Sequence, residues 1–269
     1  MSSSELKVLA LLIVLISGGA AFWHYYDDLV PSDEVVVITP PVESVPEPIP
    51  EPTGPRHPVE PLQTPETDDT EELPPLDDSD VSFLTALVVT LGTGVENLMV
   101  NEALVDRFVA TVDNLPRKQV PEKIRPVGRL VPQFSATATA DDATFVLGPE
   151  NFARYDALVS LLANADVDAL ATLYRRYYPL FQESYERLGY PHDYFNDRVV
   201  EVIDHLLLTP EPQGPVLLVR PHVLFQFTDP KLEALSSGQK LLLRIGNEHS
   251  SRVKQVLEAM RPLLVSQQG

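Results

Sequence analysis

The sequence predicts a mainly α-helical domain with a minor β-hairpin component, carried on a single N-terminal transmembrane helix through a disordered, Pro-rich acidic linker. Three observations support this prediction. An apolar run extends from Val8 to Trp23, a stretch rich in proline and acidic residues follows it, and apolar residues then recur at helical spacing in the rest of the chain. We therefore divide the chain into residues 1–7, 8–26, 27–80 and a globular domain, 81–269.

The apolar run is long enough to cross a bilayer. As a helix rising about 1.5 Å per residue, the segment from Val8 to Tyr26 covers about 28 Å, and the hydrocarbon core is about 30 Å thick. Aromatic residues crowd its outer end, within 22–26, where rings favour the headgroup level. A cleaved signal peptide is the alternative, because 18–20 are small residues, but Lys7 is the only basic residue before the run. We expect a retained anchor that contacts the lipid bilayer.

The flanking charges predict the orientation of this anchor. Lys7 precedes the run, and the first basic residue after it is Arg56. The positive-inside rule then places the N-terminus in the cytoplasm and the C-terminal domain in the periplasm, as a single-pass protein of the bacterial inner membrane. The chain has no cysteine, which fits either compartment.

The linker is defined by its composition. Residues 27–80 hold 13 of the 26 prolines and 16 acidic residues against one basic residue. Such a segment cannot bury enough apolar surface to offset its ordering entropy, and proline with like charges keeps it extended. We interpret it as a disordered spacer, with docking of its PxxP segments as the alternative.

Helical periodicity dominates the domain from Val81 onward. The predicted helices cover residues 81–90, 102–112, 149–163, 168–189, 196–208 and 236–246, with a last one after Asn247. Asn196 or Asp193 can cap the fifth, Asn247 can cap the last, and Ser236 with Gln239 matches a capping box. Strands are few: residues 134–147 alternate as a hairpin, and 216–227 can form another, broken by Pro221.

Charge excludes one class of partner for this domain. From Val81 onward the sequence has 22 acidic and 18 basic residues, a net charge of −4. Such a surface offers no electrostatic footprint for phosphate backbones, so we expect no nucleic-acid partner.

Four stretches of the domain resemble a known family. They read DNLPRKQVPEKIRPV (113–127), ENFARYDALVSLL (150–162), LYRRYYPLFQESYERLGYPHDYFNDRVVEVIDHLL (173–207) and FTDPKLEALSSGQKLLLRIG (227–246). Together they are similar to the proteobacterial domain-of-unknown-function family numbered 3014. The resemblance implies a proteobacterial membrane-tethered protein and supplies no catalytic or binding residues.

One helix face carries candidate chemistry. Asp197, Glu201 and His205 recur every four residues, with Asp204 beside them, so carboxylates and an imidazole share one face. Such a face can serve as an acid/base pair or hold a metal. An amphipathic helix also places its polar residues there for solvation alone, and we favour that interpretation. We therefore predict no catalytic residue, no metal site and no cofactor.

Tyrosines and arginines suggest an interaction surface. Tyrosine rings bury area at interfaces while their hydroxyls stay hydrogen-bonded, although core packing explains the same spacing. The residues of this predicted surface are Tyr178, Tyr185, Tyr190, Tyr194, Arg175, Arg176 and Arg198. The sequence favours a protein-interaction or structural module that binds a cell-envelope protein. The alternative is a tethered enzyme or ligand-binding domain that uses the Asp/Glu/His face.

Overall fold

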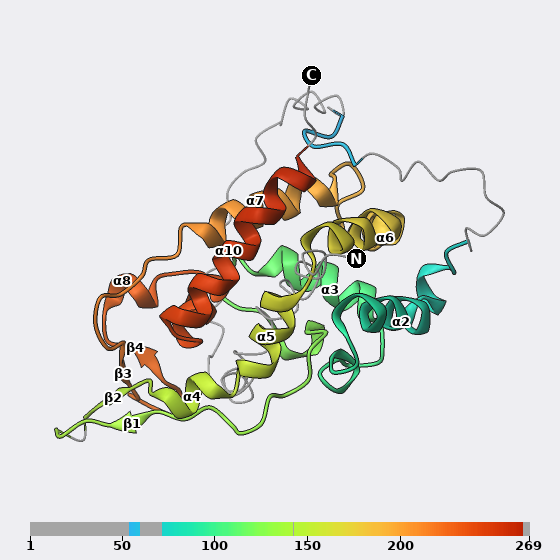
Figure 1. The fold of residues 1–269 in the computed structure, drawn as a ribbon. Helices are drawn as coiled ribbons and strands as arrows, with labels where there is room; N and C mark the ends of the chain where they lie inside the picture. The colour runs from blue at the N-terminus through green and yellow to red at the C-terminus, as the bar shows by residue number, and fades with distance from the viewer. Residues whose placement is uncertain (1–53, 60–71, 142, 266–269) are drawn as a thin grey trace, which may run out of the picture.

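The computed structural model of the chain describes residues 54–59, 72–141 and 143–265 (Figure 1). The predicted anchor, from Val8 to Tyr26, and most of the predicted linker lie outside these residues. Within the described ranges, no helix is both long enough and apolar enough to cross a membrane.

Helices make up most of the described chain, as the sequence predicts. In order they are η1 (Leu76–Asp78), α2 (Asp80–Leu91), η2 (Val95–Asn97), α3 (Leu104–Asn114), η3 (Glu122–Ile124), α4 (Pro149–Ala153), α5 (Asp156–Asn164), α6 (Val167–Arg187), α7 (Phe195–Leu207), α8 (Pro230–Glu233), α9 (Ser237–Arg244) and α10 (Asn247–Leu264). The strands are β1 (Thr137–Ala138), β2 (Thr144–Val146), β3 (Leu217–Val219) and β4 (Gln226–Phe227).

The main core forms where the long helices meet. α10 packs against α5, α6 and α7, and α3 packs against α6 and α7 (Figure 1). Phe181 of α6 lies near the middle of this core and is fully buried. Its ring centroid is 5.1 Å from that of Phe108, 5.5 Å from Tyr174 and 5.6 Å from Phe83. Aromatic rings therefore join α2, α3 and α6 through one residue.

The two predicted hairpins are confirmed, and they join into one sheet. The strand order is β1-β2-β3-β4 and every neighbouring pair is antiparallel. Phe145 of β2 pairs with Leu218 of β3, and Leu218 pairs with Phe227 of β4. Leu218 and Phe227 contribute to a second, smaller hydrophobic cluster with Leu147 and Leu243. The sheet lies at one end of the helices (Figure 1).

One predicted helix is wrong in its extent. The segment 149–163 forms two helices, α4 and α5, separated at Arg154 and Tyr155. Phe152 packs against the smaller cluster, whereas Tyr155 is buried in the main core. Residues three apart lie on the same face of a continuous helix, so the break lets these two rings reach different cores.

Two predicted caps are also wrong. α7 begins after Tyr194 without a side-chain cap, and Asn196 is buried inside it, where its amide donates to the carbonyl oxygens of His57 and Leu264. Asn247 is the first residue of α10 and donates to Pro212 O rather than to its own helix. By contrast, the capping box of Ser236 and Gln239 on α9 is confirmed.

Contacts with the domain begin upstream of Val81. Leu76 in η1 is buried in the main core, and Val59 packs against the same core. Asp80 accepts hydrogen bonds from the backbone N–H groups of Ala103 and Leu104, both at 2.7 Å, and so caps the start of α3. Parts of the predicted linker therefore contact the helices.

The start of α9 is packed too closely for a side chain. A Cβ atom at Gly238 would lie 2.7 Å from Leu206 Cδ2 of α7 and 3.1 Å from the carbonyl oxygen of Leu115, which follows α3. Real Cβ atoms essentially never approach another atom within 3.0 Å, and a contact of 3.1 Å is tighter than most. A side chain at position 238 would force Leu206 and the Leu115 carbonyl to shift, so the meeting point of α3, α7 and α9 favours glycine.

We expect Gly238→Ala to lower the free energy of unfolding by about 1–3 kcal/mol, because overpacking forces neighbouring atoms apart. Urea denaturation of the full-length protein followed by circular dichroism measures this. Gly214→Ala is the control, since its Cβ would meet nothing within 4 Å. Equal midpoints for Gly238→Ala and the wild type would contradict the close approach.

Candidate functional site: the α7 face and the Asp113 network

The four candidate residues on α7 each contact a different part of the chain. Asp197 accepts hydrogen bonds from the backbone N–H groups of Arg56 and His57, at 2.9 and 2.7 Å. The Arg56 side chain adds a long ion pair of 3.8 Å. Asp197 therefore holds residues 54–59 against α7, a role that the sequence did not predict.

Glu201 and Asp204 are held in separate ion pairs. Glu201 accepts a hydrogen bond of 2.8 Å from Arg198 on its own helix, whereas Asp204 binds Arg261 of α10 through two contacts, 2.5 and 2.9 Å. The hydrogen bonds from Arg261 lower the pKa of Asp204. A carboxyl group stabilised in its charged form is poorly suited to donate a proton at neutral pH.

His205 belongs to the capping arrangement of α9. Its Nε2 lies 2.8 Å from Ser236 Oγ, and that oxygen already accepts from the backbone N–H of Gln239. Gln239 in turn donates to the carbonyl oxygen of His205. A neutral imidazole can accept the remaining Ser236 hydroxyl proton, and burial lowers the pKa of His205. The histidine thus links α7 to α9.

The four candidate residues of the α7 face are therefore engaged in separate contacts. The four side chains point to residues 54–59, Arg198, α10 and α9 in turn. Among the residues that the structure describes, no three His, Cys, Asp or Glu side chains are grouped so that they could hold a metal ion.

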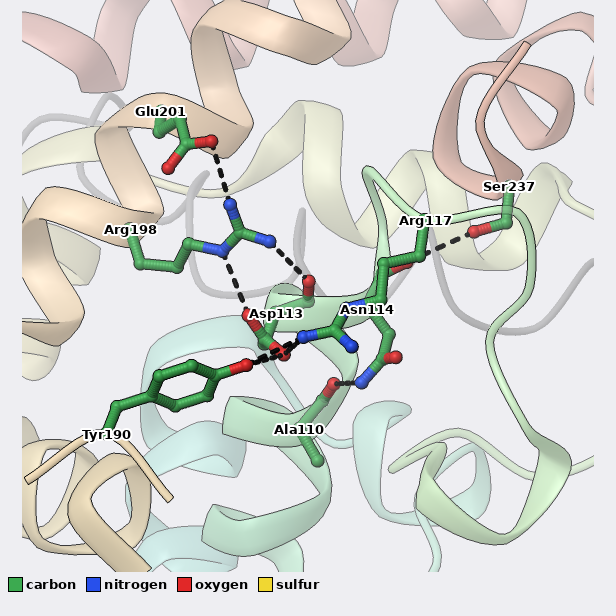
Figure 2. A network of polar contacts seen from close by, with 8 residues as sticks. All are labelled: Ala110, Asp113, Asn114, Arg117, Tyr190, Arg198, Glu201 and Ser237. Atoms are coloured by element: carbon green, nitrogen blue, oxygen red, sulfur yellow. Dashed lines mark hydrogen bonds and ion pairs between the residues drawn. The ribbon is translucent and has the colours of Figure 1, made fainter. Parts of the chain in front are cut away.

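A more concentrated polar network surrounds Asp113, in the last turn of α3 (Figure 2). Asp113 is only 3% exposed. A carboxylate is unfavourable at this end of a helix, where the dipole is negative, and it is costly to bury without partners. Arg117 and Arg198 compensate: Arg117 Nη2 lies 2.7 Å from Oδ2, and Arg198 Nε lies 3.0 Å from Oδ1.

Arg198 connects three groups at once. Besides the Asp113 carboxylate, it donates to the Asp113 carbonyl oxygen at 2.7 Å and to Glu201 at 2.8 Å. Figure 2 shows its guanidinium between these two acids. Tyr190 reaches the network from the loop after α6, because its hydroxyl accepts from Arg117 at 2.7 Å and donates to Asp113 at 3.3 Å. The charges are therefore balanced inside the domain.

The loop after Asp113 is fastened to the start of α9. The backbone N–H of Ser237 donates to Arg117 O at 2.8 Å, and that of Gly238 donates to Leu115 O at 2.9 Å. The Ser237 hydroxyl also donates to Asn114 O and Leu115 O. The first amides of α9 are thus occupied by protein carbonyls and are not free to bind an anion.

Several residues of the predicted tyrosine and arginine surface serve inside the domain. Tyr185 is 4% exposed and stacks on Tyr190, with ring centroids 4.6 Å apart. Arg198 is committed to the Asp113 network. The remaining members are half-buried: Tyr178, Tyr194, Arg175 and Arg176. An interaction surface at these four positions stays a prediction.

Sequence reasoning missed Asp113 itself. The available signal was an acidic residue at the C-terminal end of an amphipathic helix, where the dipole disfavours it, followed four residues later by Arg117. A carboxylate at that end of a helix needs a positively charged partner, which another part of the fold can supply. Periodicity alone could not identify Arg198, which is 85 residues away.

Comparison with known proteins identifies the family. A family model described as a protein of unknown function (DUF3014) matches residues 104–261. That range covers more than half of the 269 residues. The chain therefore belongs to the DUF3014 family, as its sequence resemblance implies. No curated protein and no solved structure gave a significant match.

The residues of the Asp113 network lie within the range that matches the family. Asp113, Arg117, Tyr190, Arg198 and Ser237 all fall within it. They come from three of the stretches that carry the family resemblance, which are distant in sequence. The network joins these stretches, and its acid is neutralised by two arginines. Both oxygens of the Asp113 carboxylate are therefore engaged by arginines.

We expect Asp113→Ala to lower the free energy of unfolding by about 3–5 kcal/mol, because it leaves Arg198 partly buried without its carboxylate. Chemical denaturation measures the change. The matched control is Asp77→Ala, which removes an exposed ion pair with Arg187 and should cost about 0–1 kcal/mol. Equal losses in the two variants would show that the Asp113 network is not a principal stabilising element.

His205 should make stability depend on pH. Its pKa is lower in the folded protein than in the unfolded chain, so acidification favours the unfolded state. Stability should decline as pH falls below about 6.5, the ordinary histidine pKa, and continue to decline until the folded-state value is passed. His205→Gln should flatten this part of a denaturation-versus-pH curve, and His222→Gln, at an exposed position, should not. An identical slope in His205→Gln and the wild type would contradict the assignment.

Proposed function

We propose that this chain is a single-pass membrane-anchored protein whose helical domain binds another protein in the periplasm of a proteobacterium. The segment from Val8 to Tyr26 supports the anchor because of its length and apolar composition. The Pro-rich acidic stretch after it supports a spacer.

The observation that carries the interaction role is the outer face of α2. Phe83, Leu87 and Leu91 are buried on its inner face. On the opposite face Val81 and Val89 are each 78% exposed, and Thr85 lies between them at helical spacing. The exposed face of α2 therefore presents apolar side chains to the outside of the domain.

The single polar group on this face is already satisfied. The Thr85 hydroxyl donates to the carbonyl oxygen of Val81 at 2.7 Å, so the residue offers mainly its methyl group to a partner. Val81, Thr85 and Val89 carry no charge, and half-buried Leu84 and Val88 flank them. A partner that matches this surface is a protein segment with an uncharged, apolar face, because it leaves no polar group of α2 unpaired.

The alternative, an enzyme or ligand-binding domain that uses the α7 face, has less support. Its four residues are divided among separate contacts, with Asp197 holding residues 54–59 and Asp204 paired to Arg261. Such an arrangement lacks the convergent groups of a catalytic site.

Site-specific photocrosslinking in cells tests the proposal. A photoreactive amino acid at Thr85 of the full-length protein should give one defined crosslinked species. The double variant Val81→Asp with Val89→Asp should abolish it by burying charge at the interface. Val223→Asp is the matched control, since that valine is 66% exposed in the turn before β4, and it should leave the product unchanged.

The outcomes separate the possible occupants of this face. A product that survives the α2 double variant would contradict the proposed surface. A product of twice the mass of the chain would replace the partner with a second copy. In the same assay, the double variant Tyr178→Ala with Tyr194→Ala tests whether the half-buried tyrosines belong to the same binding surface as α2. Loss of the species crosslinked from Thr85 would show that they do.

A further inference from the structure

A group of arginines surrounds Tyr155, on the side of the main core that faces the small sheet. Arg154 precedes this tyrosine between α4 and α5, and its guanidinium carbon lies 5.1 Å from the Tyr155 ring centroid. Arg244 ends α9, and Arg125 follows η3. The charges of Arg154, Arg244 and Arg125 all act on the Tyr155 hydroxyl. Segments far apart in sequence thus bring three cations to one phenol.

Asn151 fixes the arrangement of two of these segments. Its side chain is fully buried, donates to the Arg244 carbonyl oxygen at 2.9 Å and accepts from Arg154 Nη1 at 3.5 Å. The guanidinium of Arg244 lies over the Phe227 ring of β4, 5.2 Å from its centroid. Arg154 and Arg244 are therefore positioned by neighbours that carry no charge.

The nearby acids are engaged with other cations. The charge of Glu122 acts on Arg125 and that of Glu233 acts on Arg244. Glu122 nevertheless forms its ion pair with Arg129, at 2.6 Å, and Glu233 forms its ion pair with Lys240, at 2.9 Å. Among the residues that the structure describes, Arg125, Arg154 and Arg244 therefore form no direct ion pair with a carboxylate, and the two acids that act on them also pair with other bases.

Within the part of the chain that the structure describes, some buried donors of this group have no acceptor. Arg125 is 5% exposed, and its Nε and Nη2 donate to Val120 O at 3.2 and 2.5 Å, yet its Nη1 has no partner. Arg154 Nε and the Tyr155 hydroxyl are buried and unpartnered as well. Each unmatched donor costs free energy, and a charged one costs more. Three such donors among like charges indicate a missing acceptor.

We propose that Arg125, Arg154, Arg244 and Tyr155 form a binding site for a small oxyanion, a carboxylate or phosphate group on a soluble ligand. Guanidinium groups bind both chemistries through paired N–H donors, and an anion would balance the clustered charge. The proposal goes beyond the docking role of α2, because none of these residues belongs to that helix.

The protonation states agree with this assignment. Burial lowers the pKa of Arg125 to about 10, so its side chain remains positively charged at neutral pH. Burial raises the pKa of the Tyr155 hydroxyl, although the arginines oppose this, so the phenol keeps its proton. All the groups at the site are therefore hydrogen-bond donors at neutral pH, as an oxyanion requires.

Thermal unfolding of the full-length protein in a non-ionic detergent tests the site. Inorganic phosphate and succinate are compared with sodium chloride at equal ionic strength. One of the two oxyanions should raise Tm by about 5–10 °C at a concentration 100 times its dissociation constant. Which of the two raises Tm shows whether the site binds a phosphate or a carboxylate group. Arg154→Gln should lose most of this shift.

Two comparisons make the result decisive. Arg220→Gln removes a charge from an exposed arginine that stacks on Phe145 and Phe225, and it should keep the full shift. Tyr155→Phe, which removes only the hydroxyl, should bind the responding anion more weakly in isothermal titration calorimetry. The proposal is overturned if neither oxyanion exceeds chloride in the wild type, or if Arg154→Gln and Arg220→Gln respond equally.

Discussion

The burial of one carboxylate, that of Asp113, constrains the rest of the domain. Asp113 lies where α3 ends and where the helix dipole disfavours a negative charge, so it needs cations from outside α3. Arg198 supplies one from α7 and Arg117 supplies another from the following loop. In the same region, carbonyl oxygens of the loop after α3 accept hydrogen bonds from the first backbone N–H groups of α9. Gly238 permits the resulting close approach. The relative placement of α3, α7 and α9 thus follows from one electrostatic requirement.

The polar face of α7 is likewise divided among contacts with separate parts of the chain. Each polar residue on it is used to hold a different neighbour, as with Asp197 and residues 54–59 or His205 and Ser236. The unbalanced groups lie elsewhere, around Tyr155, where buried donors lack acceptors. An unpaired apolar face occurs on α2. We therefore propose binding at these two features rather than at the α7 carboxylates.

Local signals in the sequence predicted much of the fold. Periodicity located α3, α6, α7 and α10, and the capping box at Ser236 marked the start of α9 correctly. Non-local contacts decided the rest. α4 and α5 separate because Phe152 and Tyr155 enter different cores, and the two hairpins form one sheet through the pairing of Phe145 with Leu218. The partners of Asp113 and Tyr155 are equally distant along the chain, so no spacing rule could reveal them.

Hydrogen exchange at the backbone amides of Ser237 and Gly238 tests the central role of Asp113 most directly. Both amides donate to carbonyls of the loop after α3. In the wild-type protein they should exchange as slowly as core amides of α10, since they open only when the domain unfolds. In Asp113→Asn they should exchange through local opening while α10 stays protected. Rapid exchange in the wild type, or unchanged protection in the variant, would contradict the account.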